Sequence, residues 1–146
     1  MFRLIFITIL LTAQWGCGGD TAEKYNQEGF VNFQQQKYDE AIASYEKAVQ
    51  LNPKAAAAYN MIGMAYRFKY NKSGGPEFRQ KEMAAFQKAI EIDPHNWVAM
   101  INLATDYYDE GQKAKAAVLY KTALELNPDH PEKPAIQRMI KEGEQP

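Results

Sequence analysis

The sequence predicts an all-α fold made of repeated pairs of antiparallel helices. Three turns with proline at their third position interrupt the chain at Pro53, Pro94 and Pro128, 41 and 34 residues apart. Before each proline, apolar and small residues recur at steps of three and four, which is typical of one face of a helix. A period near 34 residues indicates a stack of helix pairs. Apolar residues make up 46% of the 146 residues, so these faces can form a core.

The first sixteen residues differ from the rest of the chain. One positive charge, Arg3, precedes an almost entirely apolar run over residues 4–13. This run is shorter than the ~20 residues that a membrane-spanning helix needs. A short positive start followed by a short apolar run is typical of an export signal. Residues 1–16 are therefore predicted to be a signal peptide.

The single cysteine, Cys17, follows this segment directly and cannot form an internal disulfide. With Gly16 before it, the segment resembles a bacterial lipoprotein signal, although Gln14 and Trp15 depart from that pattern. The resemblance implies a lipid-modified (palmitate-bearing) Cys17 as the new N-terminus, with residues 17–21 as a tether. It implies an exported, membrane-anchored protein facing the periplasm or the cell surface, and Gly18 favours an outer membrane if there are two. The alternative is an unmodified cysteine in an ordinary leader.

The first helix pair is expected within residues 22–55. In its second helix, charged residues alternate with apolar ones that recur at steps of three and four and so form one stripe. The members of this stripe are Tyr38, Ala41, Ile42, Tyr45, Ala48 and Val49. Two helices can cross closely only where a side chain is small, and Gly29 is expected to face Ala41. Pro53 cannot continue a helix and is expected to end the unit.

The second unit, residues 56–96, is seven residues longer than a 34-residue repeat. The surplus coincides with residues 70–76, which include the helix breakers Gly74, Gly75 and Pro76. This predicts a long, protruding helix pair joined by a loop at 70–76, with Pro76 in the first turn of the next helix. Glu82 occupies a position where the other units have alanine, so local packing there departs from the pattern.

The third unit is predicted over residues 97–130. Its second helix repeats the spacing of the first unit, in which Ala41, Tyr45 and Ala48 precede Pro53. At the same distances before Pro128 the chain has Ala116, Tyr120 and Ala123. One more helix is predicted over residues 134–142. Its apolar residues lie on one side, and they are Ala135, Ile136, Met139 and Ile140. This pattern is typical of a terminal cap that closes the end of a repeat stack.

These prolines, small residues and aromatics, in register over residues 22–130, resemble the tetratricopeptide repeat (TPR) family. The resemblance implies a right-handed superhelix in residues 22–142, with three antiparallel helix pairs and a C-terminal capping helix. It also implies that the first helix of each pair lines a concave groove. The matching positions are Asn26, Phe30, Phe33, Asn60, Met64, Arg67, Asn102, Thr105 and Tyr108.

These groove residues suit a protein or peptide partner. Asparagine amides can hydrogen-bond an extended backbone, and aromatic and methionine side chains can pack on its side chains. The alternative for each residue is that it completes the core between helices. Arg67 is the single cation among the nine. The sequence therefore predicts that Arg67 is exposed and faces an acidic residue of the partner. The substitution Arg67→Glu is then expected to weaken binding without unfolding the domain.

No enzyme, cofactor or metal site is predicted. His95 and His130 lack ligands at metal-binding spacing, and no nucleophile elbow or phosphate loop is present. With 17 basic and 18 acidic residues, charge indicates no nucleic acid. The expected function is a membrane-tethered adaptor or assembly factor that binds a partner in the groove. The alternative is a structural subunit that docks through the convex face and the long middle pair.

Overall fold

The computed structural model describes residues 19–145, in which seven α-helices and no strands are found. The helices are α1 (Ala22–Gln34), α2 (Tyr38–Leu51), α3 (Ala56–Ser73), α4 (Pro76–Ile92), α5 (Trp97–Asp109), α6 (Lys113–Leu126) and α7 (Lys133–Gly143). The predicted all-α fold of three pairs and a cap is confirmed, and α7 begins and ends within one residue of the predicted cap. The predicted export signal and Cys17 lie outside the described residues.

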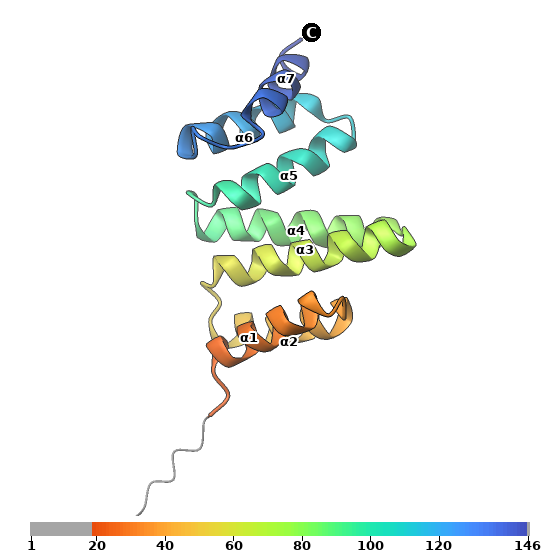
Figure 1. The fold of residues 1–146 in the computed structure, drawn as a ribbon, viewed down its shortest axis with the longest axis vertical. Helices are drawn as coiled ribbons and strands as arrows, with labels where there is room; N and C mark the ends of the chain where they lie inside the picture. The colour runs from red at the N-terminus through yellow and green to blue at the C-terminus, as the bar shows by residue number, and fades with distance from the viewer. Residues whose placement is uncertain (1–18, 146) are drawn as a thin grey trace, which may run out of the picture.

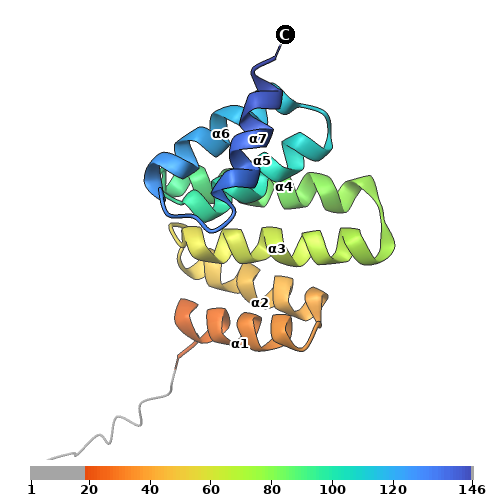
Figure 2. The same ribbon diagram turned by 45° about the horizontal axis from the view of Figure 1, so that its top comes forward.

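The helices form a stack in chain order (Figures 1 and 2). The pair α1 and α2 lies at the N-terminal end, α3 and α4 lie next to it, and α5 and α6 follow, with α7 at the far end. Each helix packs mainly on the helices before and after it. Such a stack buries a continuous core although no single pair could bury its apolar face alone. Within residues 19–145, no helix has the length and apolar character needed to cross a membrane.

Close helix crossings depend on small residues at one repeated position. A β-carbon added to Gly29 would lie 2.8 Å from the ring of Tyr45, and one added to Gly63 would lie 2.6 Å from the ring of Phe86. The third unit has Ala104 at this position, packed in one cluster with Tyr120. The atoms nearest Gly29 therefore belong to Tyr45, one turn beyond the predicted partner Ala41. A small residue opposite an aromatic ring sets the distance between the helices of each pair.

The loop that joins α3 and α4 lies within the predicted residues 70–76 but is shorter than predicted, and Pro76 is in the first turn of α4 as expected. Helix α3 continues to Ser73, whose hydroxyl donates to the carbonyl of Lys69, and α4 begins at Pro76. Only Gly74 and Gly75 lie outside the helices, with φ angles of 70° and 103° that glycine adopts readily. Two glycines thus reverse the chain, and the surplus residues extend the helices. The predicted long pair is confirmed, and Figure 2 shows its tip beyond the neighbouring pairs.

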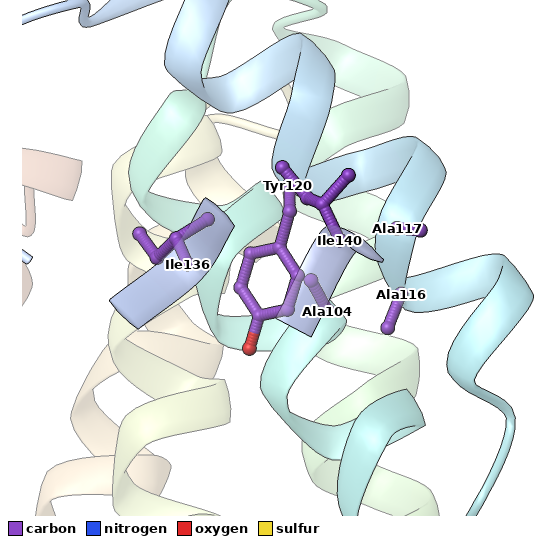
Figure 3. Packing of buried hydrophobic residues seen from close by; sticks show 6 residues of the cluster. All are labelled: Ala104, Ala116, Ala117, Tyr120, Ile136 and Ile140. Carbon is purple, nitrogen blue, oxygen red and sulfur yellow. The ribbon is translucent and has the colours of Figure 1, made fainter. Parts of the chain in front are cut away.

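Both ends of the stack are closed, each in a different way. At the C-terminal end, Ile136 and Ile140 of α7 are 1% and 8% exposed and pack on Tyr120, as the predicted cap requires (Figure 3). At the N-terminal end, α1 presents the exposed side chains of Lys24 and Glu28 to solvent. The matching positions in α3 are Ala58 and Ile62, which are buried. Polar substitution at these positions removes the apolar surface on which a preceding unit would stack.

Candidate functional site: the inner face of the stack

The nine predicted groove residues lie on three successive first helices, and the surface that they form is called the inner face here. Asn26, Phe30 and Phe33 come from α1, Asn60, Met64 and Arg67 from α3, and Asn102, Thr105 and Tyr108 from α5. Every one of them is at least partly exposed, and Phe30 is 50% exposed. The nine residues differ in how many side-chain hydrogen bonds and ion pairs they form with other residues of the domain.

The prediction that Arg67 is an exposed cation is wrong. Its side chain is only 19% exposed. Its Nε donates to Glu82 at 2.5 Å, and its Nη2 donates to Asp106 at 2.8 Å. The same guanidinium donates to the Oδ1 of Asn102 at 2.8 Å and to the carbonyl oxygen of Asn102 at 2.9 Å. Internal acceptors therefore use the donors that a partner would need.

Arg67 belongs to an ion network of four residues, Arg67, Arg79, Glu82 and Asp106. The Nη1 of Arg79 donates to Asp106 at 2.5 Å and to Glu82 at 3.3 Å. Both carboxylates are fully buried, and the two arginines are 15–19% exposed. Two guanidinium groups face two carboxyl groups in the network. It joins α3 and α4 of the middle unit to α5 of the third unit.

Burial sets the protonation behaviour of this network. It raises the pKa of Asp106 to about 7, although the positive charge of Arg67 acts in the opposite direction. The pKa of Arg79 lies above its ordinary value: burial lowers it, and the charges of Glu82 and Asp106 outweigh that effect. The second carboxylate oxygen of Asp106 is buried and has no hydrogen-bond partner among the described residues.

The network explains why Glu82 occurs where a small residue was expected. In the first and third units the same two positions hold Phe33 with Ala41 and Tyr108 with Ala116. The middle unit replaces this aromatic and alanine pair by Arg67 and Glu82, which fill the space with an ion pair. Glu82 stands out in the sequence, but its pairing with Arg67, 15 residues earlier, and the pairing of Arg67 with Asp106, 39 residues later, follow no local pattern.

The inner face of the third unit is largely bonded within the domain. Asn102 donates to Asn60 at 3.3 Å, and the hydroxyls of Thr105 and Tyr120 lie 3.0 Å apart. The hydroxyl of Tyr108 donates to Glu142 of α7 at 2.5 Å. These side chains hold helices together, so contact with a partner is left mainly to α1 and α3.

Four predicted residues on α1 and α3 make no side-chain hydrogen bond within the described residues: Asn26, Phe30, Phe33 and Met64. The Oδ1 of Asn26 is buried and has no donor among those residues. Phe33 packs edge-on against Phe68 of α3 at a ring distance of 5.5 Å. The available part of the inner face therefore combines apolar surface with one amide. Among residues 19–145, no group of histidine, cysteine and carboxylate side chains is placed to hold a metal ion.

The repeats match known proteins. A model described as TPR repeat matches residues 29–67, and one described as tetratricopeptide repeat matches residues 83–138. The TPR domain of Arabidopsis OM64 has a TM-score of 0.72 at 20% identity, covering 84% of this chain and 95% of that one. The crystal structure of MamA has a TM-score of 0.64 at 30% identity, covering 79% of this chain and 61% of that one.

A curated relative in Schizosaccharomyces pombe, the putative cargo-transport protein ypp1, is 30% identical over 97 residues. The match covers 64% of this chain and 11% of that protein. The chain thus spans about a tenth of the length of this relative, so the likeness concerns the repeats.

Paired helices, small residues opposite aromatic rings and a terminal cap define a helical repeat protein. Since both repeat models and the solved structures agree with this arrangement, the chain belongs to the tetratricopeptide repeat family.

Proposed function

We propose that this protein is an adaptor or assembly factor, tethered to a bacterial envelope membrane, that holds a segment of a partner protein on its inner face. The observation that carries the proposal is the surface of the exposed Phe30 and the partly exposed Met64, two apolar side chains on successive first helices of the stack. Apolar anchors on a rigid scaffold account for most of the affinity in many interfaces. The first TPR of Spaghetti (RPAP3) was solved bound to an HSP90 peptide, at a TM-score of 0.71 and 20% identity.

The chemistry of the inner face favours an apolar partner segment. Arg67, the one cation among the nine residues, is neutralised by Glu82 and Asp106. A partner with an acidic tail therefore gains no charge-assisted hydrogen bond there. The segment that fits best carries an aliphatic or aromatic side chain that packs on Phe30 and Met64.

A second candidate function is a structural subunit that docks through the convex face. A shallow cavity of about 380 Å³ lies between α4 and α6, and its lining includes Ile90, Leu103, Tyr107, Val118 and Leu119. Val118 is 64% exposed, the highest value among the exposed large apolar side chains of the described residues. This cavity is the specific observation that favours the alternative.

Substitutions on the two faces distinguish these functions. The partner is first isolated by affinity pull-down from membranes with the intact chain. Phe30→Ala is then expected to weaken binding about tenfold, which corresponds to ~1.4 kcal/mol, because an exposed anchor is lost. Val118→Ala serves as the matched control on the convex face and is expected to leave the affinity unchanged. The reverse result, measured by titration calorimetry, would assign the partner to the convex face.

The membrane tether predicts a separate result. With Cys17 lipidated, the mature protein is expected to partition into the detergent phase of a phase-separation assay, since two acyl chains anchor a protein stably. Cys17→Ser is expected to release the protein to the aqueous phase or to leave it unprocessed. A wild-type protein found wholly in the aqueous phase and cleaved at another residue contradicts the lipoprotein assignment.

A further inference from the structure

The long middle pair forms a pocket with the turn of the first pair. The last turns of α3 extend past the end of the first pair and overhang the turn between α1 and α2 (Figure 2). A pocket of about 250 Å³ lies in this corner. We call it the overhang pocket, and its lining residues are Gln36, Lys37, Tyr38, Asp39, Glu40, Lys69, Lys72 and Ser73.

An aromatic cluster adjoins the overhang pocket. Tyr38 stacks on Phe68 with ring centroids 5.2 Å apart, and Phe33 meets both rings edge-on at 5.5–5.6 Å. Phe68 is 39% exposed, so part of this cluster is open to solvent. Exposed aromatic edges and faces favour contact with another ring or a large aliphatic side chain.

The two walls of the pocket carry positive charge. Lys37 on the turn and Lys72 on α3 are exposed, and neither forms an ion pair with a described residue. Lys69 is already bound, because it pairs with Asp39 and lies 4.5 Å from the centroid of the Phe78 ring. Among the lining carboxylates, Glu40 forms no ion pair within residues 19–145, so the two available lysines outnumber the available acid.

The backbone at Gln36 supports a specialised turn. Gln36 has a φ of 59°, in the left-handed region that side chains other than glycine rarely adopt. At the matching turn between α5 and α6 the chain has Gly111, with a φ of 76°. The first unit thus keeps a long amide side chain, which lines the pocket, at a position where the third unit has none. A strained residue of this kind is a reason to look for a ligand nearby.

From this corner we infer a second protein-docking site, distinct from the inner-face groove, for a partner segment that carries an aromatic residue flanked by carboxylates. The ring packs on Phe68 and Tyr38, and the carboxylates pair with Lys37 and Lys72. The Gln36 amide can bond the segment's backbone. Acidic groups complement the uncommitted lysines, so a basic segment is rejected by charge.

Three short peptides test this site on the full chain in detergent. Each is acetylated and amidated and differs only in its centre, which is Glu-Trp-Glu, Lys-Trp-Lys or Glu-Ala-Glu between Gly-Ser flanks. Binding is followed by amide chemical shifts in NMR titrations. The Glu-Trp-Glu peptide is expected to shift residues 36–40 and 69–73 and to bind at least tenfold more tightly than either of the others.

Charge reversal supplies the matched comparison. The double variant Lys37→Glu/Lys72→Glu is expected to weaken the Glu-Trp-Glu peptide at least tenfold. Lys54→Glu/Lys141→Glu changes the net charge equally at two exposed lysines outside the pocket and is expected to leave its affinity unchanged. The proposal would be overturned if both variants weakened binding of the Glu-Trp-Glu peptide equally, or if this peptide did not bind the wild type. It would also be overturned if the peptide shifted only residues 26–33 and 60–64. Circular dichroism of both variants is expected to show a retained fold, because all four lysines are exposed.

Discussion

The variant Arg67→Glu is expected to lower the free energy of unfolding by about 3–5 kcal/mol, because breaking a buried ion pair strands the remaining charges. Glu82 and Asp106 are fully buried, and the new carboxylate would face both of them. Only Arg79 would remain to balance three negative charges. Urea unfolding of the wild type and the variant, followed by circular dichroism, measures the loss.

A double variant tests whether the stability lost in Arg67→Glu is due to unbalanced charge or to the changed shape of the side chain. Arg67→Phe together with Glu82→Ala recreates the pair formed by Phe33 and Ala41 in the first unit and leaves Arg79 balanced by Asp106. Replacing a buried ion pair by apolar residues is often nearly neutral. We expect the double variant to recover most of the stability lost in Arg67→Glu. A loss below about 0.5 kcal/mol for Arg67→Glu, typical of exposed sites, would show that the network does not form.

Removing the cap is expected to have the next largest effect. A chain ending at Asp129 loses α7, and with it the cover over Tyr120 and the buried side chains Ile136 and Ile140. Burying an isoleucine side chain contributes about 1.5–3 kcal/mol, so the truncated chain should lose several kcal/mol. It should also aggregate, because the apolar end of the stack becomes exposed. Thermal unfolding and light scattering measure the two effects.

Two controls accompany this truncation. A chain ending at Gly143 keeps α7 and loses only three residues, together with the exposed ion pair of Glu144 and Lys121, so it should unfold like the wild type. Ile136→Ala keeps the helix and removes one buried side chain, at a cost of about 2–5 kcal/mol. A chain ending at Asp129 that is as soluble and stable as the wild type would contradict the capping role of α7.

Much of the fold follows from local sequence patterns. Alanines and aromatics at fixed offsets before Pro53 and Pro128 determine which helix faces are buried, and the prolines end the units. Such features depend on steps of three, four and about 34 residues, which a single sequence displays directly. The cap was predictable for the same reason, since its four apolar residues lie on one side of a short helix.

Two features differ from the prediction, namely the length of the loop between α3 and α4 and the exposure of Arg67. The first depends on whether a helix continues or ends at residues without a strong breaker, and the second depends on long-range contacts. Residues 70–73 contain no strong helix breaker, and the reversal needs only Gly74 and Gly75, so the helix continues where a loop was expected. The position of Arg67 on the inner face by itself predicts an exposed side chain. Its partners Glu82 and Asp106 come from α4 and α5, and only the folded stack brings them together.

The ion network also changes where a partner is expected on the inner face. Asn102, Thr105 and Tyr108 bond to other residues of the domain, so the open surface narrows to α1 and α3. The exposed side chain of Phe30 lies in this region, and the overhang pocket lies where the same two helices end. A partner that engages both sites would contact the N-terminal half of the stack.

Site-specific photo-crosslinking in the native membrane tests the proposed function most directly. A photoreactive amino acid is placed in the full chain at Phe30 or Met64 on the inner face, and in a separate chain at Val118 on the convex face. The proposal predicts that one partner protein is crosslinked from Phe30 and Met64 and not from Val118. Crosslinks to that partner from Val118 alone would contradict it and would identify the protein as a subunit docked through its convex face.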